Sequence, residues 1–538
     1  MKLLPFLCAF ALVAAALTSC GNNGPRIESI YPAIGRLGEP LVIRGQGFGD
    51  FRGEYFVTIA GIQPTSSAYL SWGSDEIVLR LPDFASAGLV RVHRGRNISN
   101  AVLFSNEDSL PALPRRSGED SGINTRITSI EPDSAPVGSL VTIRGNNFGS
   151  SREDGVVFFS WNAPPGTFTP EFVEVSSVEL GYEFWSDREI RVRVPSGAAS
   201  GNVKVQSLHG TSQLVPFQVT GMPGTKVFGP RRSFMFSYMV DVRVEQATVP
   251  NALYIWMPQP AFSAAQRNIR LTERNISPFV ENHRGTMLFQ IRDIPRRAVR
   301  EIKLSYIVDV YAVETNITNL NPVPAAQRSP VHNAYTQASA LIPSDNEEVR
   351  SLAAQIIGPE RRPYAMARRI YDWLITSAGI QAGSLTGGVF EALSENTADS
   401  YRAALLFCAL ARAVGIPAIP VSGILINSQL GTTRHYWAEF WLDGFGWVPV
   451  DPALGAGAAP HDFDLRDDYA QFYFGNMDNQ RIAFSRGEHN LSQMTPNGRI
   501  VQRVREHSLQ NLWEEASGGL ESYTSLWSDV MVTGTFTH

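Results

Sequence analysis

An internal repeat constrains the fold of this chain more than any other feature. Residues 27–32 (IESIYP) recur as residues 127–132 (ITSIEP), and residues 38–49 are answered by residues 138–149, so the two copies run in step at a spacing of 100 residues. Each copy continues with short alternating strands bounded by Gly and Pro, which is typical of a β-sandwich. We therefore expect two similar all-β modules, one after the other.

These two segments resemble IPT/TIG domains, which are immunoglobulin-like modules, over residues 26–105 and 126–220. The resemblance makes the Gly-x-Gly-Phe-Gly stretch a structural turn with Phe48 packed inward, and Phe148 is its equivalent in the second copy. A dinucleotide-binding loop would need a helix after the glycines, and here strands are expected on both sides. Residues 106–125 are polar and rich in Pro, Ser and Gly, which indicates a linker.

The first twenty residues predict export. One Lys, an apolar run and small residues precede Cys20, so residues 1–19 have the form of a signal peptide. The last four positions, Leu-Thr-Ser-Cys, resemble the bacterial lipobox. The resemblance implies that Cys20 is acylated and that residues 20–25 form a lipidated linker, which would anchor the protein to a membrane of the cell envelope, at the outer membrane or the cell surface. An ordinary secretory signal is the alternative.

Composition narrows the possible partners. The 538 residues, 43% of them hydrophobic, are enough for several separate cores. A net charge of −5 without a dense basic run makes nucleic acid an unlikely partner. The mature chain would keep Cys408 as its one thiol, so we expect no intrachain disulfide. The nine His are scattered without ligand spacing, so we expect no metal and no cofactor.

A third β-rich region follows over residues 226–325. It contains an aromatic strand from Phe234, a strand that ends in Pro-Gln-Pro at 258–260, and Gln266. In these features it resembles, more loosely, the β-sandwich often found ahead of bacterial transglutaminase-like domains. We expect it to be a sandwich that precedes a domain with helices.

Helical periodicity begins only after residue 343. The last helical segment, residues 399–414, is stopped by Gly-Ile-Pro at 415–417 and is followed at once by strands that carry His435 and lead to Asp451. A nucleophile at a helix start, an imidazole on one strand and a carboxylate on the following strand are the parts of a catalytic triad.

Residues 343–480 strongly resemble the transglutaminase-like superfamily, which has an α+β fold of the cysteine-proteinase type. The shared pattern is Arg-Ala-x-Gly-Ile-Pro from Arg412, then His-x-Trp-x-Glu, then Gly-Trp-x-x-x-Asp-Pro. The resemblance makes His435 the general base and Asp451 its orienting carboxylate. It also places the family's catalytic Cys at position 400, where this chain has Ser400.

The exchange of Cys for Ser changes the expected chemistry. A helix start and an imidazolium can lower a thiol pKa from ~8.5 to ~3.5–7.5, whereas a Ser hydroxyl must lose its proton during attack. A pocket shaped for sulfur does not supply that alignment by default. We therefore expect a catalytically degenerate domain rather than an active one. The alternative is an acyl transferase or protease-like hydrolase that uses Ser400, His435 and Asp451.

Three other residues are weaker candidates. Cys408 lies two turns further along the same helix in an apolar stretch, so we expect a buried, inert thiol. Trp437 shares a strand face with His435 and could line the cleft. Glu439 lies on that face too, either as a partner of the catalytic pair or as an exposed carboxylate.

The remainder, residues 481–538, is expected to pack back as strands. Taken together, the sequence favours a cell-envelope lipoprotein whose degenerate transglutaminase-like domain binds a polypeptide or another envelope ligand. Two alternatives remain: the serine enzyme, and a structural adhesin in which the sandwiches bind.

Overall fold

The computed structural model describes residues 24–537 apart from eight internal segments. The segments outside the description are residue 33 and residues 36–37, 83–87, 107–123, 153–154, 165–170, 177–178 and 319–328. The expected signal peptide and Cys20 therefore lie outside the described residues. No helix among those described is long and apolar enough to cross a membrane. The chain divides into two compact units, residues 1–115 and 116–538.

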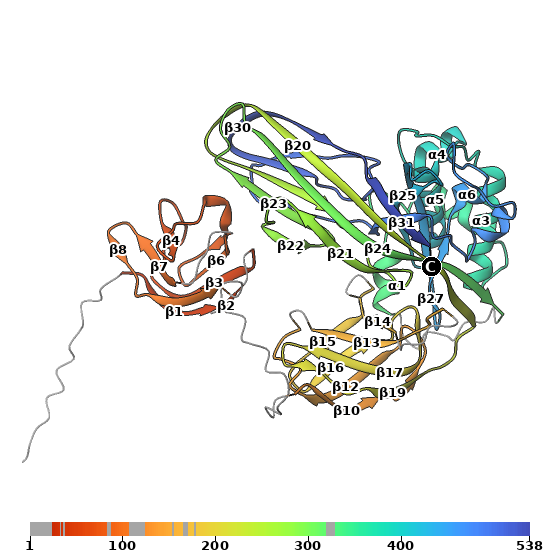
Figure 1. Ribbon diagram of the computed structural model, residues 1–538, viewed down its shortest axis with the longest axis horizontal. Helices are drawn as coiled ribbons and strands as arrows, with labels where there is room; N and C mark the ends of the chain where they lie inside the picture. The colour runs from red at the N-terminus through yellow and green to blue at the C-terminus, as the bar shows by residue number, and fades with distance from the viewer. Residues whose placement is uncertain are drawn as a thin grey trace, which may run out of the picture. The chain divides into compact units, whose positions relative to one another are not determined.

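The first repeat is a sandwich of two sheets whose strands pair antiparallel, except that β2 pairs with β9 in parallel (Figure 1). One sheet has the order β1-β3-β6-β5, and the other has the order β2-β9-β7-β4 with β8 paired to β7. The bounds are β1 Arg26–Tyr31, β2 Ile34–Gly35, β3 Pro40–Gln46, β4 Phe56–Ile59, β5 Tyr69–Trp72, β6 Glu76–Arg80, β7 Gly88–Arg94, β8 Asn97–Ile98 and β9 Val102–Asn106, with a 3₁₀ turn at Ser66–Ala68.

The second repeat has the same plan. Its sheets have the orders β10-β12-β16-β15 and β11-β19-β17-β13-β14, with β18 paired to β17. The bounds are β10 Arg126–Glu131, β11 Ser134–Ala135, β12 Leu140–Asn146, β13 Val156–Trp161, β14 Phe172–Glu174, β15 Tyr182–Trp185, β16 Glu189–Arg193, β17 Ala198–Ser207, β18 Gly210–Thr211 and β19 Val215–Val219. Phe48 and Phe148 are both buried, and in each copy a Trp indole donates to that Phe carbonyl. The predicted inward Phe is confirmed.

The third region is one eight-stranded sheet built from two distant parts of the chain. The strands from the first part are β20 Gly224–Pro258, β21 Gln266–Arg274, β22 Val280–His283, β23 Thr286–Arg292 and β24 Val299–Ile317. They are joined by β29 Arg499–Val501, β30 Glu514–Trp527 and β31 Met531–Thr537. Figure 1 shows the blue C-terminal strands beside the long β20, and the register pairs Val240 with Trp527. The last part of the chain thus completes this region.

The helical domain packs its helices on a four-stranded sheet of order β27-β26-β25-β28. The helices are α1 Pro330–Tyr335, α2 Glu347–Ile357, α3 Pro363–Ser377, α4 Val389–Glu395, α5 Ser400–Ala413, α6 Pro452–Gly455 and α7 Tyr469–Phe472. The strands are β25 Ala418–Ile426, β26 Thr432–Leu442, β27 Gly446–Val450 and β28 Arg481–Arg486. Since β28 pairs with β25, the sheet continues beyond the domain end that we expected at residue 480.

Candidate active site

Helix α5 begins at Ser400, where the sequence resemblance leads us to expect the nucleophile. Asp399 caps the helix, because its Oδ1 accepts from the Arg402 amide at 2.9 Å and its Oδ2 accepts from the Leu385 amide at 2.8 Å. Ser400 is the first helical residue and is half-buried. The Ser400 side chain therefore sits at the positive end of the helix dipole, where developing negative charge is stabilised.

His435 and Asp451 form a buried pair. His435 lies on β26 and is 2% exposed, and Asp451 follows β27 and is fully buried. The His435 Nε2 lies 2.8 Å from Asp451 Oδ2, so the carboxylate fixes the ring through Nε2 and leaves Nδ1 for another partner. The other oxygen of Asp451 accepts from the Leu454 amide at 3.0 Å and caps α6.

The charge state of Asp451 follows from these contacts. Burial by itself raises the pKa of this carboxyl, but the His435 ring and then the Arg481 guanidinium oppose that effect and lower the pKa to about 2. Asp451 is therefore ionised at every pH at which the protein is expected to work. An ionised carboxylate holds the Nε2–H tautomer of His435, which leaves Nδ1 able to accept a proton.

Ser400 and His435 line the same open cavity, with a volume of about 730 Å³. Within the described part of the chain, no hydrogen bond joins the Ser400 hydroxyl to His435. The structure thus brings His435 and Asp451 into direct contact, and it places Ser400 in the wall of the cavity that His435 also lines. The other residues around this cavity are Gln381, Ala382, Gly383, Ser384, Asp399, Thr432, Thr433, Arg434, Tyr436, Ala458, Pro460, His461, Arg505 and Asp529.

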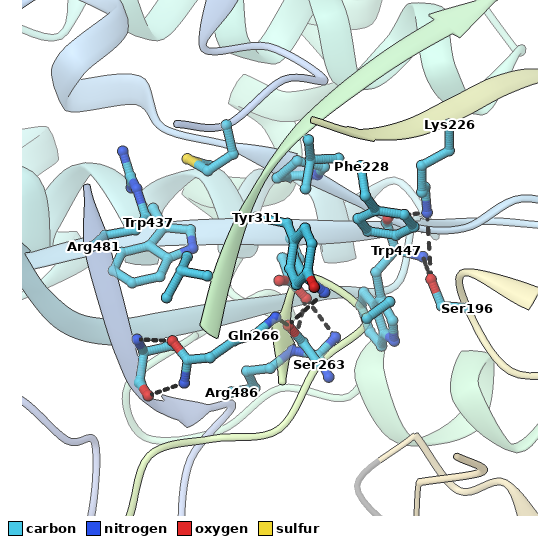
Figure 2. Close-up of a pocket in the computed structure, with 18 of the residues that line it drawn as sticks. Ser196, Lys226, Phe228, Ser263, Gln266, Tyr311, Trp437, Trp447, Arg481 and Arg486 are labelled. Atoms are coloured by element: carbon cyan, nitrogen blue, oxygen red, sulfur yellow. Dashed lines mark hydrogen bonds and ion pairs between the residues drawn. The ribbon is translucent and has the colours of Figure 1, made fainter. Parts of the chain in front are cut away.

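The other two candidates on β26 do not line the cavity that Ser400 and His435 line. Trp437 stacks against His435, with ring centroids 6.4 Å apart and planes at 23°. Glu439 does not reach the His435–Asp451 pair, and its Oε2 instead accepts from Arg486 at 2.6 and 3.0 Å. Both line a second, smaller cavity of about 70 Å³ (Figure 2). Glu439 is therefore a structural partner of Arg486 rather than a partner of His435.

The smaller cavity lies where the second repeat, the β20 sheet and the helical domain meet. Lys226 from β20 is buried there and donates to the Trp447 carbonyl at 2.7 Å, the Phe445 carbonyl at 3.3 Å and the Ser196 hydroxyl at 3.3 Å. Arg486 bridges Glu439 to Glu179 of the second repeat at 3.2 Å. These contacts join three parts of the chain behind the sheet that carries His435.

Cys408 is a buried, inert thiol, as expected. It is fully buried within α5, and burial raises the pKa of its thiol to about 12. A protonated, inaccessible thiol cannot replace a nucleophile at position 400. Among the residues with described positions, no cluster of three or more His, Cys, Asp or Glu could hold a metal ion.

Sequence reasoning missed Arg481, Asp478 and Arg505, which surround the site. Arg481 bonds to Asp451, Asp478 bonds to Arg481, and Arg505 pairs with Asp399. One signal was available: an Arg that opens the apolar strand Arg-Ile-Ala-Phe at 481–484 can be buried only with a carboxylate partner. The partner itself could not be named, because it lies in a distant segment.

Comparison with family models supports this architecture. The transglutaminase-like superfamily model matches residues 350–452, and the IPT/TIG domain model matches residues 25–105 and 125–220. The chain therefore contains two TIG domains (TIG1 and TIG2) and a transglutaminase-like domain, and the expected fold class is confirmed. The transglutaminase-like match ends one residue after Asp451, so Arg481 lies outside it.

Individual relatives are distant. An uncharacterised protein of Haemophilus influenzae is 26% identical over 228 residues, which is 35% of this chain and 60% of that protein. A structure described as a putative cysteine protease from Cytophaga hutchinsonii has 15% identity and a TM-score of 0.38, covering 58% of this chain and 92% of that one. The periplasmic domain of TgpA from Pseudomonas aeruginosa has 17% identity and a TM-score of 0.24, covering 40% and 87%.

Proposed function

We propose that this chain is a cell-envelope lipoprotein whose transglutaminase-like domain is catalytically degenerate and binds a polypeptide or another envelope ligand in the cavity beside Ser400 and His435. The observation that carries the proposal is a Ser at the nucleophile position whose hydroxyl makes no hydrogen bond to His435 within the described residues. A thiolate can be stored without such a bond, but a Ser hydroxyl needs it to transfer its proton during attack.

The cavity suits a segment of polypeptide. Its volume of about 730 Å³ is within the usual range for ligand pockets, roughly 300–1,000 Å³. Its rim charges are already paired within the protein: Arg434 lies 3.0 Å from Asp529 and 3.1 Å from Glu506. Because pairing leaves little free charge at the rim, a ligand would be held mainly by shape and by hydrogen bonds rather than by its net charge.

Binding can be tested by filling the cavity. Thr433 is exposed on the cavity wall, and Thr433→Arg should weaken the binding of a fluorescent casein-derived peptide about tenfold or more, because the new side chain occupies the site. The matched control is Thr376→Arg on α3, which is also exposed but does not line the cavity. Equal peptide affinity for both variants and the parent would contradict binding at this site.

A serine acyl transferase or hydrolase is the second candidate, and the buried His435–Asp451 bond favours it. In that reaction Ser400 Oγ bonds to the acyl carbon while its proton moves to His435 Nδ1. The proton then passes to the leaving amine as the carbon–nitrogen bond breaks. Water or another amine, deprotonated by His435, then bonds to the acyl carbon. The bond from that carbon to Ser400 Oγ breaks, and the proton passes from His435 Nδ1 back to Oγ.

Variants at position 400 separate the two candidates. Incorporation of a fluorescent amine into casein and release of casein fragments are measured for the parent, Ser400→Ala and Ser400→Cys. A degenerate domain predicts no activity in the parent and a gain in Ser400→Cys, whose thiol should titrate well below ~8.5 beside His435. Parent activity that is lost in Ser400→Ala would overturn the degenerate assignment and establish the serine enzyme.

The membrane anchor is tested separately. We propose that acylation of Cys20 holds the protein at the membrane, since the apolar run ahead of it is removed with the signal peptide. Cys20→Ala should move the protein to the soluble fraction, measured by fractionation and immunoblotting. Retention of this variant in the membrane fraction would contradict the lipid anchor.

A further inference from the structure

Arg481 makes the closest charged contact to the His435–Asp451 pair. It lies on β28 and is 3% exposed. Its Nη1 donates to Asp451 Oδ2 at 2.9 Å, and the same oxygen accepts from His435 Nε2 at 2.8 Å. With the Leu454 amide on Oδ1, the carboxylate is held by three donors from three directions. A carboxylate held in this way cannot turn, so the position of the His435 ring is set by Arg481 as well as by Asp451.

Asp478 supplies the charge that allows Arg481 to be buried. Its carboxylate accepts from Arg481 Nη2 at 2.5 Å and from Nε at 3.3 Å, and it also accepts from the Gln480 amide at 2.8 Å. Two carboxylates on opposite sides of one guanidinium fix it in a forked geometry, which a Lys ammonium would not reproduce. Asp478, Arg481, Asp451 and His435 thus form one buried chain of charged contacts.

Arg481 also supports the face of the His435 ring. Its guanidinium lies 4.9 Å from the centroid of the Trp437 ring (Figure 2). Trp437 in turn stacks against His435. The imidazole is therefore held at its edge through Asp451 and at its face through Trp437, and one arginine contacts both supports. Loss of Arg481 should release both supports at once.

We propose that Arg481, backed by Asp478, is a positioning residue that aims His435 Nδ1 at the nucleophile position. This role rests on the site proposed at Ser400 and His435, with either oxygen or sulfur as the nucleophile. Groups that hold a catalytic imidazole through its carboxylate act by orientation, and small losses of alignment reduce reaction rates by large factors.

The position of His435 can be measured without any reaction. In protein labelled with ¹⁵N-histidine, the His435 Nε2–H signal, assigned with His435→Gln, should lie downfield and exchange slowly with water. Arg481→Met should speed that exchange by roughly tenfold or more, and Arg481→Lys should give an intermediate rate because it keeps the charge without the fork. Arg267→Met, which removes a similarly buried arginine from β21, should leave the signal unchanged.

An unchanged His435 signal in folded Arg481→Met, with folding checked by circular dichroism, would overturn the inference. If Arg481→Met does not fold, Asp478→Asn provides the test. This variant keeps Arg481 but removes its counter-charge, so it should also speed the exchange, and an unchanged rate would overturn the proposal.

A measurement of thiol reactivity separates the role of Arg481 from the function of the site. Arg481→Met should slow iodoacetamide alkylation of Ser400→Cys about tenfold at pH 7. If Ser400→Cys with Arg481 intact is alkylated slowly, the proposed site at Ser400 and His435 is contradicted. The exchange rate of the His435 signal would still test the role of Arg481 independently.

Discussion

The two TIG domains share a fold but differ in what surrounds them. In both, a Trp indole donates to the buried Phe carbonyl and a Tyr hydroxyl accepts from a Val amide, at 2.8 Å in TIG1 and 3.1 Å in TIG2. TIG1 is a compact unit by itself, whereas TIG2 belongs to the same unit as the transglutaminase-like domain. The common residues thus build the module, and other residues determine what it is packed against.

A single position of the repeat illustrates the difference. Trp161 in TIG2 is 4% exposed and packs against Phe228 and Tyr311 of the β20 sheet, each with ring centroids 5.0 Å away, and the Arg267 guanidinium lies 3.8 Å from its ring. The equivalent position in TIG1 is Gly61, which is exposed and has open space where a Cβ would lie. Trp161 is therefore one of the side chains that pack TIG2 against the rest of its unit, and Gly61 supplies no such side chain in TIG1.

Trp161→Gly, which copies TIG1 into TIG2, should have the largest effect. Removing a buried Trp costs about 3–5 kcal/mol of unfolding free energy. Calorimetry should show a lower transition for the larger unit and an unchanged transition for TIG1. Phe48→Ala is the control, since it removes a buried ring of TIG1 and should lower only the TIG1 transition. A Trp161→Gly protein with an unaltered calorimetric profile would show that this contact does not hold TIG2 in place.

Arg486→Met should come next. Arg486 holds Glu439 and Glu179 together, so its loss leaves two largely buried carboxylates close to each other, at a cost of about 3 kcal/mol measured by urea unfolding. The matched variant is Arg44→Met in TIG1, where the arginine pairs with Glu76 at 2.9 Å but both side chains are exposed. Exposed pairs contribute little, so Arg44→Met should unfold like the parent. Similar urea midpoints for the two variants would show that the ion pairs of Arg486 stabilise the protein no more than the exposed pair of Arg44.

The smallest predicted effect is a pH dependence of stability at Lys226, which lines the same cavity as Arg486. Burial lowers the pKa of Lys226 to about 8 from 10.5, with Glu179 and then Glu439 opposing the shift. Between these two pH values the unfolded chain binds more protons than the folded one, so stability rises with pH across this window and is lost as pH falls toward 8. The gain by pH 10 is at most about 2 kcal/mol. We expect it as a steeper rise of Tm from pH 8 to 10 in the parent than in Lys226→Met, and parallel curves would contradict it.

Much of the site was readable in the sequence. The order of Ser400, His435 and Asp451 on a helix start and two following strands is a local pattern. The structure places Ser400 and His435 on the expected elements, and it places Asp451 one residue after its expected strand, as the N-cap of α6. The sequence did not show which residue each charged side chain pairs with. Glu439 pairs with Arg486, and Asp451 with Arg481, because antiparallel pairing of β25 with β28 brings distant segments together.

The sequence by itself determined the modules: the 100-residue repeat, the buried Phe of each copy, and the helix and strands of the transglutaminase-like domain follow from local periodicity and turn residues. Only the tertiary structure decided which distant strands complete each sheet. Strands β30 and β31 complete a sheet that begins almost 300 residues earlier, and β28 places Arg481 behind Asp451. The physical reason is that strand pairing satisfies backbone groups of any sequence, so the choice of partner depends on long-range packing that no local pattern records.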